Sequence, residues 1–178
     1  MKMEIDNKLL ESRIIILNDE INENSASEVI KKLLYLDSIN NDTIFLYINS
    51  PGGIVTQGLA IIDCMEFIKS EVSTLCYGQA CSMGAIILAA GSKGKRYALN
   101  HADIMIHEVS GGYSGDIDDL TISYNNMNRK RKDIIDILEK STKKNRREID
   151  KIIKKDYYMS AKEAKEFGII DAIVFPSN

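Results

Sequence analysis

Apolar residues in the first half of this chain alternate between short β-branched runs and longer stripes at helical spacing. The runs that predict strands are "RIIIL" (13–17), "TIFLYINS" (43–50) and "VSTLCYG" (72–78). The stripes that predict helices are "SASEVIKKLLYLDSI" (25–39), "IVTQGLAIIDCMEFIKS" (54–70) and "SMGAIILAAG" (82–91). This alternation indicates an α/β fold with a largely parallel sheet, built from β-α-β units.

The second half continues the pattern and adds a long polar helix. "KRYAL" (95–99), "DIMIHEV" (103–109) and "IIDAIVF" (169–175) predict strands. A helix rich in Lys and Arg is predicted from about Asp116 to Ser141, and "RREIDKIIKKD" (146–156) predicts a shorter one. Because the sequence has no internal repeat and no linker-like stretch, we expect residues 1–178 to form a single domain.

Two helix starts carry capping signals. Ser25 and Glu28 have the S-x-x-E spacing of a capping box, which predicts that the first helix begins at Ser25. Ser160 and Glu163 repeat this spacing before "AKEAKEFG", and Gly168 is typical of a helix end.

Composition narrows the classes of partner. The net charge of −3 gives no general electrostatic reason to expect nucleic acid or an anionic membrane. No apolar run reaches the roughly 18 residues of a membrane span, and the start "MKMEIDNKLLESR" is too charged for a secretory signal. We therefore expect a cytoplasmic protein. Three cysteines without a C-x-x-C pair and two histidines predict reduced thiols and no metal site.

Two turns between strand and helix are candidates for chemistry, because reactive sites in parallel sheets gather at the carboxyl ends of strands. In "NSPGG", Gly52 and Gly53 allow backbone N–H groups to approach a ligand, although a plain tight turn explains the same residues. In "GQACSMG", Ser82 precedes a buried helix and resembles the serine of a G-x-S-x-G elbow, with Ala80 in place of the first glycine. A serine in this position is more often an ordinary helix cap.

A serine nucleophile needs a base, and the base needs an orienting group. His107 ends an apolar strand, whereas His101 lies in the polar turn "LNHAD" and suits a solvated side chain. Spacing alone does not select one acidic partner among 26 carboxylates. The residues by themselves therefore indicate an α/β domain that is a candidate serine hydrolase.

Six segments, in order, resemble the proteolytic subunit of Clp protease (ClpP). They are "YINSPGG", "GQACSMGA", "GSKGKRY", "MIH", "GGYSG" and "YYMSAKEAKEFGIIDAI", and the similarity runs from about Leu9 to Ile173. The resemblance implies a ClpP/crotonase-like α/β spiral of β-β-α units, in which the helix at about 116–141 is a projecting handle. It also implies an ATP-dependent serine endopeptidase that degrades unfolded polypeptides and needs no cofactor.

The resemblance assigns roles to single residues. Matching the family's motifs makes Ser82 the nucleophile, His107 the base and Asp156, which precedes "YYMS", the orienting carboxylate. The N–H groups of Gly53 and Met83 would form the oxyanion hole.

The same resemblance implies partners. Members of the family form two stacked seven-membered rings that receive polypeptide from an AAA+ Clp unfoldase. The unfoldase docks in apolar clefts between subunits, and the matching residues here are Leu34, Phe45, Tyr47, Phe67 and Tyr97. Leu34 also suits an ordinary core position, and Phe45 and Tyr47 alternate along a strand as any half-buried pair would.

Three departures from the family pattern stand out. About a dozen residues of the usual N-terminal gating segment are expected to be missing, because Met1 lies close before Leu9. Glu108 and Val109 replace a Gln-Pro pair, and a carboxylate beside His107 would favour the protonated imidazole, a poorer base. Lys155 replaces an arginine whose bidentate pairing lysine cannot reproduce.

These departures suggest a second, divergent ClpP paralogue that works best in a mixed assembly with a fuller subunit. Two alternatives stay open: a weakly active structural subunit of such an assembly, and an acyl-CoA enzyme of the crotonase type, whose oxyanion hole also consists of two backbone N–H groups.

Overall fold

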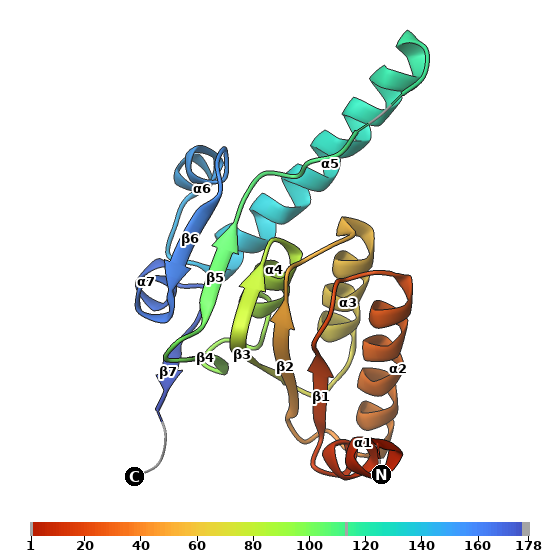
Figure 1. Cartoon of the computed structure of the whole chain (residues 1–178), viewed down its shortest axis with the longest axis vertical. Helices are drawn as coiled ribbons and strands as arrows, with labels where there is room; N and C mark the ends of the chain where they lie inside the picture. Colours follow the sequence, from red (N-terminus) through yellow and green to blue (C-terminus); the bar gives the residue numbers. More distant parts are fainter. Residues whose placement is uncertain (1, 113, 176–178) are drawn as a thin grey trace.

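A seven-stranded sheet organises the computed structural model, which describes residues 2–112 and 114–175 (Figure 1). Within these residues the strands are β1 (Ile14–Leu17), β2 (Ile44–Ser50), β3 (Val72–Cys81), β4 (Arg96–Leu99), β5 (Asp103–Ile106), β6 (Tyr157–Ser160) and β7 (Ala172–Val174). The helices are α1 (Lys2–Glu11), α2 (Glu23–Ile39), α3 (Val55–Phe67), α4 (Met83–Ala89), α5 (Ile117–Ser141), α6 (Arg146–Ile152) and α7 (Ala161–Phe167). Tyr113 of the "GGYSG" motif and residues 176–178 lie outside the described residues.

The sheet follows the order β1-β2-β3-β4-β7, and each neighbouring pair on this path is parallel. The strand β5 also pairs with the long strand β3 in parallel, and β6 pairs with β5 antiparallel. The strand-helix order from β1 to β4 matches the predicted β-α-β units and confirms the predicted α/β fold. The antiparallel strand β6 was not predicted, because "YYMS" is too short for its polar and apolar residues to show a period.

Alternation along β2 defines a buried and an open face of the sheet. Ile44, Leu46 and Ile48 are fully buried, whereas Phe45 is 39% exposed. The buried face packs against α2 and α3, which lie side by side next to the first two strands (Figure 1). The short helix α4 is buried along its whole length, so its first residue, Met83, is held by the core.

The handle helix is confirmed with nearly the predicted bounds. α5 begins after Asp116, whose side chain accepts a hydrogen bond from the N–H of Asp119, and it ends at Ser141. Figure 1 shows its first turns projecting away from the rest of the molecule. Only its C-terminal half is anchored, through the buried Ile134, Ile135 and Leu138. Among the described residues no helix combines the length and the apolar character needed to cross a membrane.

The predicted cap at Ser25 is wrong by one turn. α2 begins at Glu23, and its cap is Asn22, whose side chain accepts hydrogen bonds from the N–H groups of Asn24 and Ser25. The Ser25 hydroxyl accepts from the Asn22 N–H in return, so Ser25 completes a capping box that begins three residues earlier. The second predicted box, Ser160 with Glu163, is confirmed, and Gly168 ends α7 in the left-handed conformation.

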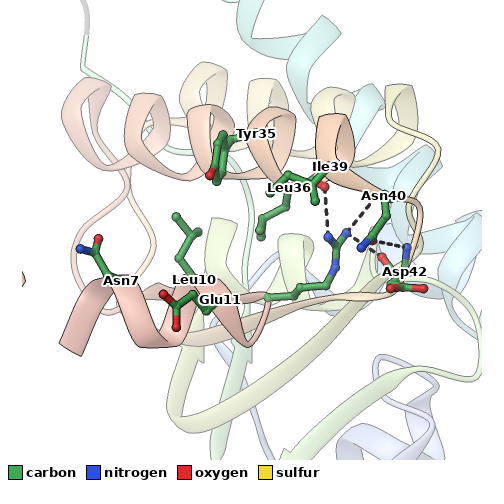
Figure 2. A pocket seen from close by; sticks show the side chains of 9 residues that line it. Asn7, Leu10, Glu11, Tyr35, Leu36, Ile39, Asn40 and Asp42 are labelled. Atoms are coloured by element: carbon green, nitrogen blue, oxygen red, sulfur yellow. Dashed lines mark hydrogen bonds between the residues drawn. The ribbon is translucent and has the colours of Figure 1, made fainter. Parts of the chain in front are cut away.

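Arg13 joins α1 to the C-terminal end of α2, an arrangement that the sequence did not indicate. It is one of two non-glycine residues with positive φ (60°) among those described, and its guanidinium donates to the carbonyls of Leu36, Asn40 and Asp42. Arg13 also lines the cavity of about 410 Å³ between the two helices. Figure 2 shows Leu10 of α1 and Leu36 of α2 on opposite sides of this cavity. The hydrogen bonds compensate for the left-handed backbone of Arg13, whose cost is about 1–2 kcal/mol.

Candidate active site

Ser82 lies at a sharp turn between the end of β3 and the start of α4. Its backbone adopts φ 53° and ψ −123°, a conformation that L residues rarely adopt. The turn is held because the Ser82 N–H donates to the carbonyl of Met105 (2.8 Å), and the Ser82 carbonyl accepts from Ala85 and Ile86. Strained backbone that its surroundings over-determine is frequent at functional sites.

The Ser82 side chain does not cap the helix that follows it. Ser82 occupies the N-cap position of α4, but its hydroxyl makes no cap hydrogen bond. Instead Oγ lies 2.8 Å from Nε2 of His107, within hydrogen-bonding distance. The capping interpretation of Ser82 is therefore not supported by this geometry.

The pairing of β5 with β6 places His107 opposite Asp156. In this antiparallel ladder Asp103 faces Ser160 and Ile106 faces Tyr157, so one further step brings His107 to Asp156. Nδ1 of His107 lies 3.2 Å from Oδ1 of Asp156. The His107 side chain is 29% exposed and that of Asp156 is 59% exposed, so the carboxylate lies at the surface of the chain.

The turn after β2 brings Gly52 and Gly53 against Ser82. A Cβ atom added to Gly52 would lie 2.6 Å from the Ser82 Cβ and 3.2 Å from the Met83 nitrogen. Gly53 forms an isolated bridge with Ile21. Within residues 2–112 and 114–175 the N–H groups of Gly53 and Met83 donate no hydrogen bond, so both remain available to a ligand.

These groups surround a small cavity of about 60 Å³. The cavity is lined by Gly53, Val55, Ser82, Met83, Ile86, His107, Glu108, Val109, Ser110 and Ile134. Its apolar side chains come from α3, α4, α5 and Val109 in the segment after β5, and its polar side chains are those of Ser82, His107, Glu108 and Ser110. A hydroxyl, an imidazole, a carboxylate and two backbone donors are the groups that acyl transfer requires.

The carboxylate of Glu108, the residue next to His107, is bound to an arginine of α5. This carboxylate accepts a hydrogen bond from Nε of Arg131, and Nη2 of the same guanidinium donates to Asp150 (2.6 Å). Arg131 and Asp150 were not recognised from the sequence, because "NRKRKD" offers several equivalent basic residues. His101 is exposed, as expected for its polar turn.

The cysteine next to Ser82 is a poor candidate nucleophile. Cys64, Cys76 and Cys81 are free and buried. Burial raises the pKa of the Cys81 thiol, and Asp103 raises it further, so the thiol stays protonated near neutral pH. Burial likewise raises the pKa of Cys76 to about 12. Among the described residues no group of three or more His, Cys, Asp or Glu side chains is placed to hold a metal ion.

The five residues expected to form a docking cleft lie at the surface in two groups. Phe45 and Tyr47 alternate along β2, and Tyr97 is in register with Tyr47 across β3, so these three share the open face of the sheet. Leu34 on α2 and Phe67 at the end of α3 are 45% and 82% exposed. Burial in the core of the chain therefore does not explain Leu34 or Phe67.

A comparison with models of protein families agrees with these observations. The family model described as Clp protease matches residues 1–177 of the 178 residues.

Proposed function

This chain belongs to the Clp protease family of peptidases, and we propose that it is a serine endopeptidase with Ser82, His107 and Asp156 as its triad. The observation that carries the proposal is the contact of 2.8 Å between the Ser82 hydroxyl and His107 Nε2, with Asp156 at Nδ1. The substrates are unfolded polypeptides.

The geometry suits acyl transfer to water. Ser82 Oγ attacks the peptide carbonyl, and His107 takes the hydroxyl proton at Nε2 and passes it to the leaving amine. Asp156 at Nδ1 fixes the tautomer in which Nε2 is the acceptor, and it stabilises the imidazolium that forms. Water then attacks the acyl-enzyme, with His107 again acting as base, and Ser82 is released.

The proposed oxyanion hole consists of the N–H groups of Gly53 and Met83. Both residues line the cavity beside Ser82, and neither N–H has an acceptor among the described residues. A tetrahedral intermediate would place its oxyanion between them. Loss of one such donor typically costs about 10²–10³ in rate.

We further propose that the protein works in the cytoplasm as stacked seven-membered rings, alone or mixed with a second paralogue. An AAA+ Clp unfoldase would supply polypeptide with the energy of ATP. The unfoldase would dock on Leu34, Phe45, Tyr47, Phe67 and Tyr97, because these residues form two partly or fully exposed groups, one on the sheet and one on α2 and α3, that adjacent subunits could combine.

Cleavage of a short fluorogenic peptide by the wild type and by Ser82→Ala tests the peptidase proposal. We expect Ser82→Ala to lose nearly all turnover while its melting temperature and sedimentation profile stay unchanged. A structural subunit would give equally low turnover in both proteins, and an acyl-CoA enzyme would bind coenzyme A in calorimetry. Either result would replace the proposal.

Docking is tested by ATP-dependent degradation of an unfolded protein with a purified Clp unfoldase. Phe67→Ser should abolish this degradation and leave peptide cleavage intact, because Phe67 is 82% exposed and does not line the cavity beside Ser82. Ile39→Ser is the matched control, since Ile39 is also exposed (57%) but lies outside the five residues. Equal effects of the two substitutions would contradict the docking proposal.

A further inference from the structure

The guanidinium of Arg131 connects the two chain segments that carry His107 and Asp156. Its Nε donates to the carboxylate of Glu108, the residue directly after His107. Its Nη2 donates to Oδ1 of Asp150 on α6 at 2.6 Å, and α6 leads into the segment that ends at Asp156. One planar group therefore links the residue that follows His107 to the helix that leads toward Asp156.

The hydrogen bonds of the sheet do not reach the contact between His107 and Asp156. The last residue pair of the β5–β6 ladder is Ile106 with Tyr157, so His107 and Asp156 lie one step beyond it. Residues 108–112 and 114–116, which follow His107, form neither helix nor strand. The position of the two side chains consequently depends on what holds the segments that lead away from them.

Arg131 supplies this support from a fixed part of the handle. It lies three and four residues before Ile134 and Ile135, which are buried in the core at 5% and 1% exposure, so they lie on the same side of α5 as Arg131. The Arg131 side chain is itself only 24% exposed. Burial alone would lower its pKa, but the hydrogen bonds to Asp150 and Glu108 outweigh burial and raise the pKa.

The same ion pair restrains a charge beside the base. The charged groups around His107 are Asp156 from the segment before β6, Glu108 from its own segment, and Arg131 from α5 through Glu108. With its carboxylate bound to Arg131, Glu108 is directed toward α5. Without Arg131 the carboxylate would be free to approach the imidazole and favour its protonated form.

We propose that Arg131 is a positioning residue of the active site: through Glu108 and Asp150 it holds His107 in line with Ser82 and Asp156. The proposal rests on the function proposed above. Arg131 touches neither substrate nor reacting atoms, so its effect is on turnover and not on peptide binding.

The test compares Arg131→Met with Arg131→Lys in steady-state peptide cleavage. Arg131→Met should lower kcat about 10- to 100-fold with little change in KM, since a misplacement of about 1 Å has an effect of this size. Arg131→Lys should recover part of the loss, because one ammonium can replace one arm of the fork. Arg146→Met is the matched control: Arg146 also pairs across α5 and α6, with Asp136, but contacts neither segment.

A pH profile separates positioning from a general loss of stability. In Arg131→Met the acid limb of the kcat profile should move to higher pH, because the freed Glu108 carboxylate favours imidazolium. Adding Glu108→Gln should return the limb to its wild-type position. If Arg131→Met does not assemble, the double variant Glu108→Gln/Asp150→Asn keeps the guanidinium while weakening both contacts, and the same drop in kcat is expected.

Three results would each overturn a different part of the account: the role of Arg131, the role of Glu108 or the proposed function. A kcat for Arg131→Met within about threefold of wild type, or an equal loss in Arg146→Met, overturns the role of Arg131. An unshifted acid limb overturns the part of the proposal that concerns Glu108. Full activity of Ser82→Ala, measured alongside, overturns the proposed function itself and is thereby distinguished from the other two.

Discussion

Gly52→Ala is the substitution whose effect on the proposed nucleophile follows most directly from the structure. Gly52 has φ 98°, and its peptide is fixed on both sides. Its N–H donates to the Ser50 hydroxyl (3.1 Å) and its carbonyl accepts from the Ile21 N–H (2.8 Å). A methyl group at Gly52 would lie 2.6 Å from the Ser82 Cβ and 2.7 Å from the Cys81 carbonyl oxygen.

The magnitude has two parts, one on stability and one on activity. Placing alanine at this φ costs about 1–2 kcal/mol, whatever the neighbours. Restoring the 2.6 Å contact to an ordinary 3.4 Å also requires Gly52 and Ser82 to separate by about 0.8 Å. Hydrogen bonds hold the backbones of both Gly52 and Ser82, so the two residues share this displacement. A displacement of the Ser82 hydroxyl by up to about 1 Å reduces turnover by as much as about 10²-fold.

Gly94→Ala serves as the control that separates the effect on activity from the effect of a strained backbone on stability. Gly94 has a similar positive φ of 85°, but a Cβ atom there would meet nothing within 4 Å. In thermal denaturation both variants should lose the stability that the positive φ costs, and Gly52→Ala should lose more, because its methyl group also overlaps Ser82 and the Cys81 carbonyl. Peptide cleavage should fall about 10- to 100-fold in Gly52→Ala and stay near wild type in Gly94→Ala.

The reasoning would be refuted if both alanine variants cleaved peptide equally well. It would also be refuted if the loss in Gly52→Ala followed its thermal stability and not the rate at which Ser82 reacts with a fluorophosphonate. Either result would mean that the contact between Gly52 and Ser82 does not set the position of the hydroxyl.

Three further predictions use other parts of the molecule. Asp156→Asn should reduce kcat on the order of 10²–10⁴-fold in peptide cleavage, because an amide no longer selects the His107 tautomer; a loss below tenfold would contradict this. Burial alone would raise the pKa of Asp171, but hydrogen bonds from the buried Arg96 outweigh it and lower the pKa from 3.8. The Asp171 carboxylate therefore stabilises the fold above its unfolded-state pKa and loses this contribution as pH falls through the lower folded-state value. In thermal denaturation Asp171→Asn should destabilise by about 3 kcal/mol at pH 7 and flatten the fall in Tm between about pH 5 and pH 2; an unchanged pH dependence would refute this role. Cys81→Ala should change peptide cleavage less than about threefold, since its thiol is protonated at neutral pH; a larger loss would implicate Cys81.

Much of the fold was predictable because its signals are local. The runs that became β1 to β5 and β7, the buried helix α4 and the handle α5 each carry a local signal: β-branched residues, bounding turn residues or helical spacing. The strand β6 was missed because its four residues gain their conformation from pairing with β5, a long-range contact that leaves no period in "YYMS". The cap of α2 was placed one turn late, because Asn22 and Ser25 both suit a cap and only the backbone decides between them.

In the candidate site, too, local sequence indicated some residues, and only long-range contacts revealed others. Small residues around Ser82 indicated a sharp turn, and the strand end at His107 indicated a position beside it. The choice of Asp156 came from resemblance, since spacing does not select among 26 acidic residues. The register of β5 with β6 now supplies a physical reason for that choice. Arg131 was beyond reach, because its two carboxylate partners lie 23 and 19 residues away and belong to separate segments.

The identity of the nucleophile is tested most directly by locating a covalent adduct. The wild-type protein is treated with a fluorophosphonate, digested, and analysed by tandem mass spectrometry; Ser82→Ala is treated in parallel. We predict one modified residue, Ser82, and loss of both the adduct and peptide cleavage in Ser82→Ala. An adduct on Cys81 or another residue, with cleavage retained in Ser82→Ala, would contradict the account.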